Sequence, residues 1–293
     1  MCKVTIWGTA ILVAPLLASS VLAQRPPSAL EQMVSTEQAF ARRAGVIGWK
    51  QSFLEYFADD AIGFADDHTE PAKDQLRQVP DPPKDLQLLW EPRWGDIAAS
   101  GELGFLTGPS TTINPARNNG APRHGNYASV WKRQPDGSFK VLIDVGISTP
   151  EAVPFAPGFT RAPAGDRYRG TDTVEAATRA LAEADRLLTR GALGNQAVAY
   201  GPVLAEGIRL HRPGTMPVAG RAEAERWLQT QPAYSAGTSL KAEVAASRDL
   251  GYTWGTYTLP AAGATSQKGM YLRVWVRTAS GRWQVALDVL QPQ

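Results

Sequence analysis

HGNYASVWKRQPDGSFKVLIDVG, residues 124–146, decides the fold of this chain, because the stretch occurs a second time as KGMYLRVWVRTASGRWQVALDVL at 268–290. The second copy keeps, without gaps, the residues that in the first copy are Gly125, Tyr127, Val130, Trp131, Arg133, Gly137, Val141 and Asp144. In each copy, β-branched and aromatic residues alternate on both sides of a short turn, PDGS or ASGR. This alternation predicts two β-strands joined by a hairpin.

The segment before the first hairpin predicts helices followed by strands. Residues 30–44 carry a face with three- and four-residue spacing, which indicates an amphipathic helix with Ser28 as its cap. The positions on that face are Leu30, Met33, Val34, Glu37, Phe40, Ala41 and Ala44. Shorter helices are predicted at 49–57 and 72–79, and strands from Leu86 onward. Helices followed by an antiparallel sheet predict an α+β fold.

The same order of segments starts again after a stretch rich in Pro, Gly and Ala. AASGELG at 98–104 matches AASRDLG at 245–251 with an offset of 147, whereas the two hairpins are offset by 144, so the loop between them is three residues shorter in the second copy. A length difference confined to one loop is typical of duplicated folded units. The predicted boundaries are 28–150 for the first domain, 151–171 for the linker and 172–293 for the second domain.

Residues 1–23 are typical of a secretory signal peptide. Lys3 precedes an apolar run that ends at Leu17, and Val21-Leu22-Ala23 supplies the small-residue pattern of a cleavage site. The run is too short for a stable membrane span. We therefore expect cleavage near Ala23 and a periplasmic or secreted protein without membrane insertion.

Composition narrows the possible chemistry. Cys2 is the only cysteine and lies in the predicted signal, so the exported chain is expected to have neither a disulfide nor a reactive thiol. The chain has 30 Lys and Arg against 28 Asp and Glu, a formal net charge of +2, and its basic residues are scattered singly. Because nucleic-acid binding requires a clustered basic face, no nucleic-acid partner is expected.

SGELGFLTG and SRDLGYTWGTY, each followed by a Tyr-x-x-Val-Trp-x-Arg strand, a Gly turn and a Val-x-x-Asp strand, resemble the DUF4440 branch of the NTF2-like superfamily, also called SnoaL-like. The resemblance covers both halves of the chain. It implies two tandem cone domains, each with three N-terminal helices packed on a curved antiparallel sheet. It also implies that the two domains form an intrachain pseudo-dimer through their sheets, with a homodimer of whole chains as a further expectation.

The superfamily includes isomerases, cyclases, dehydratases and lyases that need no cofactor, and proteins that only bind ligands. A cofactor-free isomerase of this shape needs a carboxylate base in an apolar cavity and a neutral hydrogen-bond donor. The candidate bases are Asp66, Asp67, Asp144 and Asp288, and the candidate donors are Tyr127, Tyr257, Tyr271 and the tryptophan indoles. The predicted catalytic residues are Asp67, His124, Tyr127 and Asp144, with either aspartate as the base.

Asp144 and Asp288 occupy equivalent places inside otherwise apolar strands. Buried carboxylates are usually paired or hydrogen-bonded, which favours a structural role for both. Strand alternation places Asp144 on the side opposite Val141 and Val145. If the valine side faced the helices, Asp144 would face the partner domain and would not act as a base.

The histidines do not indicate a metal site. His68, His124 and His211 are the only ones in the chain, and neither HExxH nor His-x-His spacing occurs. His124 begins the repeated strand beside the loop at 111–123, a position at the rim of a cavity, and Lys268 takes its place in the second copy. No metal and no cofactor are expected.

The chain has nine tryptophans, and rigid aromatic side chains either fill a core or line a cavity for an apolar ligand. The residues predicted to bind a ligand are Trp90, Trp131, His211, Trp254, Tyr257 and Tyr271. We expect functional residues where the two copies differ, for example where Thr107 is replaced by Trp254.

Three functions are compatible with the sequence. The leading hypothesis is an exported tandem protein that binds a small apolar or aromatic molecule in a cone cavity. The second is a cofactor-independent isomerase, cyclase or lyase that acts by proton abstraction. The third is a structural or protein-binding module in which one cone has lost its cavity to packing.

Overall fold

The computed structural model describes residues 1, 27–65, 68–163, 165–260 and 266–293. The predicted signal peptide, apart from Met1, lies outside the described residues. In the described part of the chain, no helix combines the length and the apolar character that crossing a membrane requires.

The N-terminal half, from α1 to β8, is a mixed α+β unit. Its helices are α1 Ala29–Ile47, α2 Trp49–Tyr56 and α3 Ala72–Gln78, with a 3-10 turn at Asn118–Gly120. Its strands are β1 Phe57–Ala65, β2 His68–Pro71, β3 Gln87–Trp90, β4 Trp94–Ile97, β5 Leu103–Ile113, β6 Arg123–Arg133, β7 Phe139–Ser148 and β8 Thr160–Arg161. The sheet has the order β2-β1-β7-β6-β5-β4-β8, and β3 also pairs with β5.

The C-terminal half, from α4 to β14, repeats this arrangement. Its helices are α4 Val174–Ala192, α5 Gln196–Tyr200 and α6 Arg221–Leu228, with a 3-10 turn at Gly201–Val203. Its strands are β9 Leu204–His211, β10 Val218–Ala219, β11 Ala236–Val244, β12 Leu250–Leu259, β13 Gln267–Arg277 and β14 Trp283–Pro292. The order β10-β9-β14-β13-β12-β11 matches β2-β1-β7-β6-β5-β4 position by position.

The prediction of antiparallel sheets is wrong for β4 and β8 of the N-terminal half, which are parallel, and for one equivalent pair of strands in each half. β1 runs parallel to β7, and β9 runs parallel to β14. The cause is the connection: the strand that follows the first two helices joins the sheet beside the last strand of the half, in the same direction. The other pairs of the shared strand order are antiparallel.

The start of α1 is the one predicted, whereas its end lies at Ile47, beyond the predicted Ala44. Ser28 and Glu31 form a reciprocal capping box, because the Glu31 N–H donates to Ser28 Oγ (3.2 Å) and the Ser28 N–H donates to Glu31 Oε2 (2.5 Å). Gly48 ends α1 with a φ of 84°, a backbone conformation that favours glycine, and redirects the chain into α2. The buried face of α1 consists of Met33, Glu37, Phe40 and Ala44.

A β-bulge decides which way Asp144 points. Val130 pairs with Ile143, but Trp131 pairs with Val141, so Leu142 is an extra residue in β7. Asp144 pairs with Ser129, and both side chains face the helices of the N-terminal half. The possibility that Asp144 faces the partner sheet is therefore not realised.

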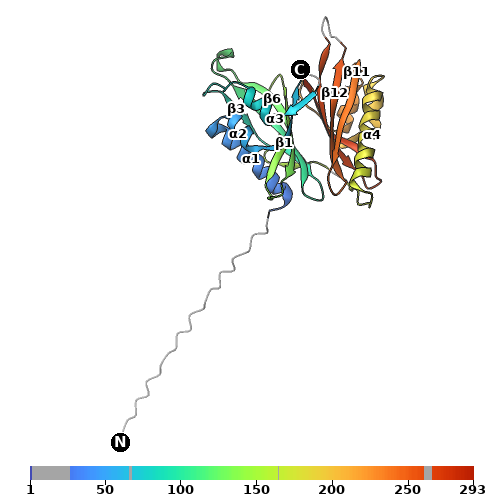
Figure 1. The fold of residues 1–293 in the computed structure, drawn as a ribbon, viewed down its shortest axis with the longest axis horizontal. Coiled ribbons are helices and arrows are strands. Elements are labelled where there is room, and N and C mark those ends of the chain that lie inside the picture. The colour runs from blue at the N-terminus through green and yellow to red at the C-terminus, as the bar shows by residue number, and fades with distance from the viewer. Residues whose placement is uncertain (2–26, 66–67, 164, 261–265) are drawn as a thin grey trace.

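The two sheets pack against each other, and the helices cover their outer flanks (Figure 1). One apolar cluster contains residues of both sheets. Its members from the central strands include Ala128, Val130, Ile143 and Val145 from the first sheet and Met270, Leu272, Val274, Leu287 and Val289 from the second. This sheet-to-sheet core holds the two halves together.

The turns after β4 and β11 touch across the interface in a reciprocal manner. The hydroxyls of Ser100 and Ser247 are 2.7 Å apart. The Ala99 N–H donates to the carboxylate of Asp249 at 3.1 Å, and the Ala246 N–H donates to Glu102 Oε1 at 2.6 Å. Matched contacts of this kind are typical of an interface with two-fold symmetry.

Candidate functional site

Glu37 is a carboxylate in the core of the N-terminal half. It is fully buried on α1, and its carboxylate accepts hydrogen bonds from Trp90 Nε1 (2.6 Å), Ser129 Oγ (2.8 Å) and Trp131 Nε1 (2.8 Å). Burial raises its pKa from 4.5 to about 7, although the three hydrogen bonds act in the opposite direction. Glu37 thus fixes the indole rings of Trp90 and Trp131 and the hydroxyl of Ser129 on the side of the sheet that faces α1.

Next to this group lies an inner cavity of 120 Å³. It is lined by Phe53, Leu88, Trp90, Ser110, Tyr127, Asp144 and Gly146. The walls are mostly aromatic or apolar, and the titratable groups in the lining are Asp144 and Tyr127. The cavity is about the size of a single aromatic ring.

Asp144 and Tyr127 present unpaired polar groups to this cavity. No hydrogen bond to the Asp144 carboxylate is found within the described residues, and the Tyr127 hydroxyl is buried without a partner there. Burial, with a smaller contribution from the charge of Glu37, raises the pKa of Asp144 well above its usual range. Burial also raises the pKa of Tyr127, so its hydroxyl keeps its proton and can donate it in a hydrogen bond.

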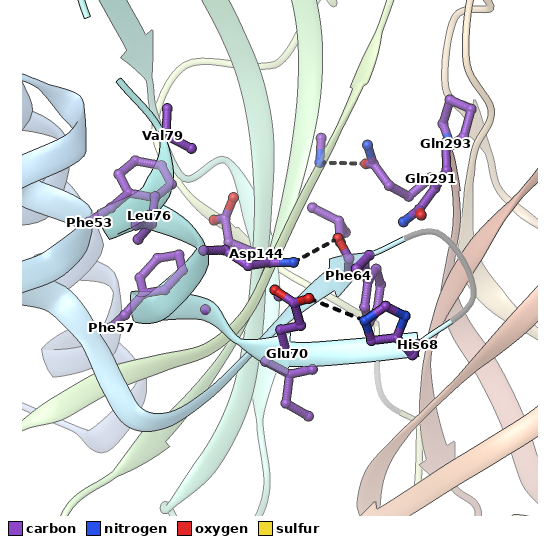
Figure 2. Close-up of a pocket in the computed structure, with 18 of the residues that line it drawn as sticks. Phe53, Phe57, Phe64, His68, Glu70, Leu76, Val79, Asp144, Gln291 and Gln293 are labelled. Carbon is purple, nitrogen blue, oxygen red and sulfur yellow. Dashed lines mark hydrogen bonds and ion pairs between the residues drawn. The ribbon is translucent and has the colours of Figure 1, made fainter. Parts of the chain in front are cut away.

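The inner cavity adjoins an outer cavity of 680 Å³, and the two share Phe53, Asp144 and Gly146 as lining residues. The outer cavity lies between the helices, the β1–β2 hairpin and the end of β14 (Figure 2). Asp144 lies beside Phe53 among the residues that line it (Figure 2), and both residues also line the inner cavity. A ligand that spans both cavities therefore contacts Asp144.

In the described part of the C-terminal half, larger side chains occupy three positions of the inner side, two of which line the inner cavity in the first half. The strand registers align Gly125 with Gly269 and Tyr127 with Tyr271, which fixes the comparison. The replacements from the first half to the second are Ser110 to Tyr257, Ser129 to Arg273 and Gly146 to Leu290. Tyr257, Arg273 and Leu290 are all buried.

Arg273 also pairs with two buried carboxylates of the C-terminal half. Its guanidinium binds Asp185 at 2.7 Å and Asp288 at 2.8 Å, and Asp288 further accepts from Tyr200 Oη (2.6 Å) and pairs with Arg212 (2.8 Å). Burial alone would raise the pKa of Asp288, but the charges of Arg212 and Arg273 hold it below its usual value. Asp288 is thus a paired structural carboxylate.

The first half lacks all three partners that Asp288 has. The registers of β1 with β7 and of β9 with β14 place Phe53 at the position of Tyr200 and Ala65 at the position of Arg212. Ser129 stands in place of Arg273. Asp144 is therefore left unpaired by three substitutions that remove one hydroxyl and two guanidinium groups.

The structure brings together three of the residues that the sequence singled out, namely Trp90, Tyr127 and Asp144. Trp131 lies behind them as a donor to Glu37. Asp67, together with Asp66, lies outside the described residues.

The other predicted site residues lie away from both cavities. His124 is partly buried at the start of β6, with its Nδ1 3.5 Å from Thr111 Oγ1. Tyr257 and Tyr271 are buried in the core of the C-terminal half, where the Tyr271 hydroxyl donates to Asp185 at 2.7 Å.

His211 and Trp254 lie between the two sheets. His211 is fully buried beside Asn126, whose Nδ2 is 3.0 Å from the imidazole Nε2. Burial and the positive charges of Arg209 and Arg212 lower the pKa of His211 to about 3, so the ring is neutral. The Trp254 ring packs 6.0 Å from Phe64 of the other half.

Glu37 and Ser129 lie next to the candidate site but are not among the site residues predicted from the sequence. Glu37 was assigned to the apolar face of the first helix, and a carboxylate on such a face is itself an indication of a buried site. Ser129 faces Arg273 in the aligned repeats, and this contrast of a small hydroxyl with a guanidinium was readable from the sequence.

The side chains can bind a ligand and move a proton. An unpaired carboxyl group with a raised pKa can serve as a general base or acid, and a phenol hydroxyl can stabilise a developing oxyanion. Within the described residues, no group of three or more His, Cys, Asp or Glu side chains has an arrangement that could hold a metal ion.

No family model matches the chain, and no curated protein matches it. Among solved structures, it is similar to a conserved protein from Planctomyces limnophilus DSM 3776, with 14% identity, coverage of 39% of this chain and 94% of that chain, and a TM-score of 0.33. It is also similar to an NTF2-like protein of unknown function from Pseudomonas putida KT2440, with 10% identity, coverage of 41% and 89%, and a TM-score of 0.35. A Mycobacterium tuberculosis protein in complex with estradiol-17beta-hemisuccinate matches with 10% identity, coverage of 39% and 92%, and a TM-score of 0.31. At these scores the likenesses carry no argument about function, which rests on the site itself.

Proposed function

We propose that the N-terminal half binds a small, mainly apolar or aromatic molecule in the two adjoining cavities and transfers a proton to or from it through Asp144. The observation that carries this proposal is the unpaired carboxylate of Asp144 beside the unpartnered hydroxyl of Tyr127 in one cavity. A polar group shielded from water without a partner is costly, and a ligand that hydrogen-bonds to Asp144 and Tyr127 would recover that cost. The reaction class is a cofactor-independent isomerisation or elimination.

In the proposed reaction, the Asp144 carboxylate removes a proton from a carbon next to a carbonyl group of the ligand. The electron pair of the broken C–H bond forms the enolate, whose oxygen accepts a hydrogen bond from the Tyr127 hydroxyl. Asp144 then returns the proton to another carbon, or to a leaving hydroxyl group. Burial raises the pKa of Asp144, and a raised pKa makes the carboxylate a stronger base toward a C–H proton.

We also propose that each half is an NTF2-like domain of the DUF4440 type, with boundaries at 28–150 and 172–293, and that the two form an intrachain pseudo-dimer after export to the periplasm or the medium. The shared strand order and the reciprocal contacts between the two turns support the duplication. In this arrangement the C-terminal half is a structural domain, because Arg273 and its neighbours fill its cone.

Exchange of carbon-bound protons tests the proposal. 2-Tetralone, a ketone with one aromatic ring and acidic protons next to the carbonyl, is incubated with the protein in D2O, and exchange is followed by NMR. We expect exchange faster than in buffer, and a loss of about a hundredfold or more in the variant Asp144→Asn, the usual range for removal of a general base. Exchange should accelerate as the pH rises through the raised pKa of Asp144.

Asp85→Asn serves as the matched control, because Asp85 is exposed and outside both cavities. This variant should exchange like the wild type. Equal exchange in Asp144→Asn and the wild type would rule out Asp144 as the base, and wild-type exchange no faster than buffer would count against proton transfer on such ketones.

A further inference from the structure

The outer cavity is built from both halves of the chain. Most of its lining comes from α2, β1, β2, α3 and β7, but Gln291 and Pro292 belong to the last strand of the C-terminal half. Figure 2 shows Gln291 on the side of the cavity opposite Phe53 and Leu76. The closed C-terminal domain therefore still contributes directly to the cavity of its partner.

The side chain of Gln291 is held by Gly146, a residue that also lines the inner cavity. Its Oε1 accepts a hydrogen bond from the Gly146 N–H at 3.1 Å. Gly146 lines both cavities, and its lack of a side chain leaves the backbone open to this contact. Because the oxygen of Gln291 is used on Gly146, its amide N–H groups remain as donors at the cavity wall.

The other groups of the outer cavity restrict what these donors can bind. Glu70 and Asp144 both line it, and Glu70 is hydrogen-bonded to His68 at 3.2 Å. Two carboxyl groups disfavour an anionic ligand group in the same cavity. The matching group for Gln291 is thus an uncharged acceptor such as an alcohol, ketone or amide oxygen.

We propose that Gln291 is a specificity-determining residue, which binds a neutral hydrogen-bonding tail on ligands whose aromatic head lies in the inner cavity beside Asp144. This inference rests on the proposed function, since it assumes that the cavity beside Asp144 takes the head. Asp144 and Gly146, whose N–H binds Gln291, are two positions apart in β7, which is about 7 Å along a strand. A three-atom tail beside the head group spans such a distance.

Three phenols test the inference by calorimetric titration. Phenol carries the head alone, 2-propylphenol adds an apolar tail, and 2-(3-hydroxypropyl)phenol adds the same tail with a terminal hydroxyl. The tail is attached ortho to the phenol hydroxyl. If that hydroxyl binds Asp144, the tail starts where the inner cavity meets the outer one. In Gln291→Leu, which keeps the size of the side chain, we expect two- to tenfold weaker binding of 2-(3-hydroxypropyl)phenol, as for the loss of one neutral hydrogen bond.

Phenol and 2-propylphenol should bind Gln291→Leu as they bind the wild type. Gln229→Leu, at an exposed position after α6, is the control and should leave all three affinities unchanged. Gln291 does not bind the tail if Gln291→Leu lowers the affinity for all three phenols equally. The same conclusion follows if the affinity for 2-(3-hydroxypropyl)phenol is unchanged. If phenol itself fails to bind the wild type, the proposed function fails together with this inference.

Discussion

Glu37 shows how one side chain couples the site to the stability of the fold. It is an acid whose pKa rises from 4.5 in the unfolded chain to about 7 in the folded one, mainly because it is buried. The folded state therefore holds a proton that the unfolded state releases between these pH values. The free energy of unfolding should fall as the pH rises from 4.5 to 7, by on the order of 3 kcal/mol from this group.

Replacement of Glu37 by Gln should remove this dependence. Gln presents a donor where one indole N–H now finds an acceptor, so the variant should be less stable by about 1 to 3 kcal/mol at low pH, where Glu37 is protonated. The informative quantity is the slope of stability against pH, measured by urea unfolding at pH 4.5 and 7. His211 contributes a slope of the opposite sign, because its lowered pKa costs stability as the pH falls below 6.5, but this contribution cancels in the difference from the wild type.

Glu151→Gln, at an exposed position, is the control for Glu37→Gln and should keep the wild-type slope. An unchanged slope in Glu37→Gln would show that Glu37 is ionised in the folded protein throughout this range. The three donors around it would then outweigh its burial.

At the level of elements, local patterns predicted the helices and strands well. Ser28 as cap, the three helices before the first hairpin and the hairpin itself are confirmed, because caps, periodicity and turns act over a few residues. The direction of Asp144 was not predictable in the same way. It depends on the bulge at Leu142, which inserts one residue into the alternation and results from pairing with β6.

Gly146 in β7 offers a direct way to close the inner cavity. A Cβ at this position would meet nothing nearer than the Asn126 carbonyl oxygen at 4.0 Å, so a side chain fits the backbone and extends into the cavity. In Gly146→Leu, the residue found at this place in the second half, we expect phenol affinity to fall at least tenfold. The free energy of unfolding should stay the same or rise by about 1 kcal/mol, since apolar surface is buried.

Phenol titration and urea unfolding of Gly146→Leu should be compared with Gly45→Leu. Gly45 lies on α1 and lines neither cavity, and a Cβ at its position would meet no atom within 4 Å. Wild-type phenol affinity in Gly146→Leu would show that the ligand does not occupy the inner cavity.

For the whole molecule, the repeated sequence predicted two similar halves, and the structure adds that they differ in their interiors. Residues differ on both sides of the sheets. On the facing sides Asn126 and Thr107 correspond to Met270 and Trp254, and on the inner sides Ser129 corresponds to Arg273. Ser129 donates a hydrogen bond to Glu37 in the first half, whereas its counterpart Arg273 binds Asp185 and Asp288 in the second. The aligned copies already show Ser129 opposite Arg273. Only the structure shows that both side chains point toward the helices, the side on which the candidate site lies.

A crystal of the protein soaked in phenol would test most directly whether the N-terminal half binds the ligand and the C-terminal half does not. We predict one phenol per chain, in the inner cavity of the N-terminal half, with its hydroxyl within hydrogen-bond distance of Asp144 or Tyr127. No phenol should enter the C-terminal half, where Tyr257, Arg273 and Leu290 occupy the space. Phenol bound in the core of the C-terminal half, or absent from the cavity beside Asp144, would contradict the proposed site.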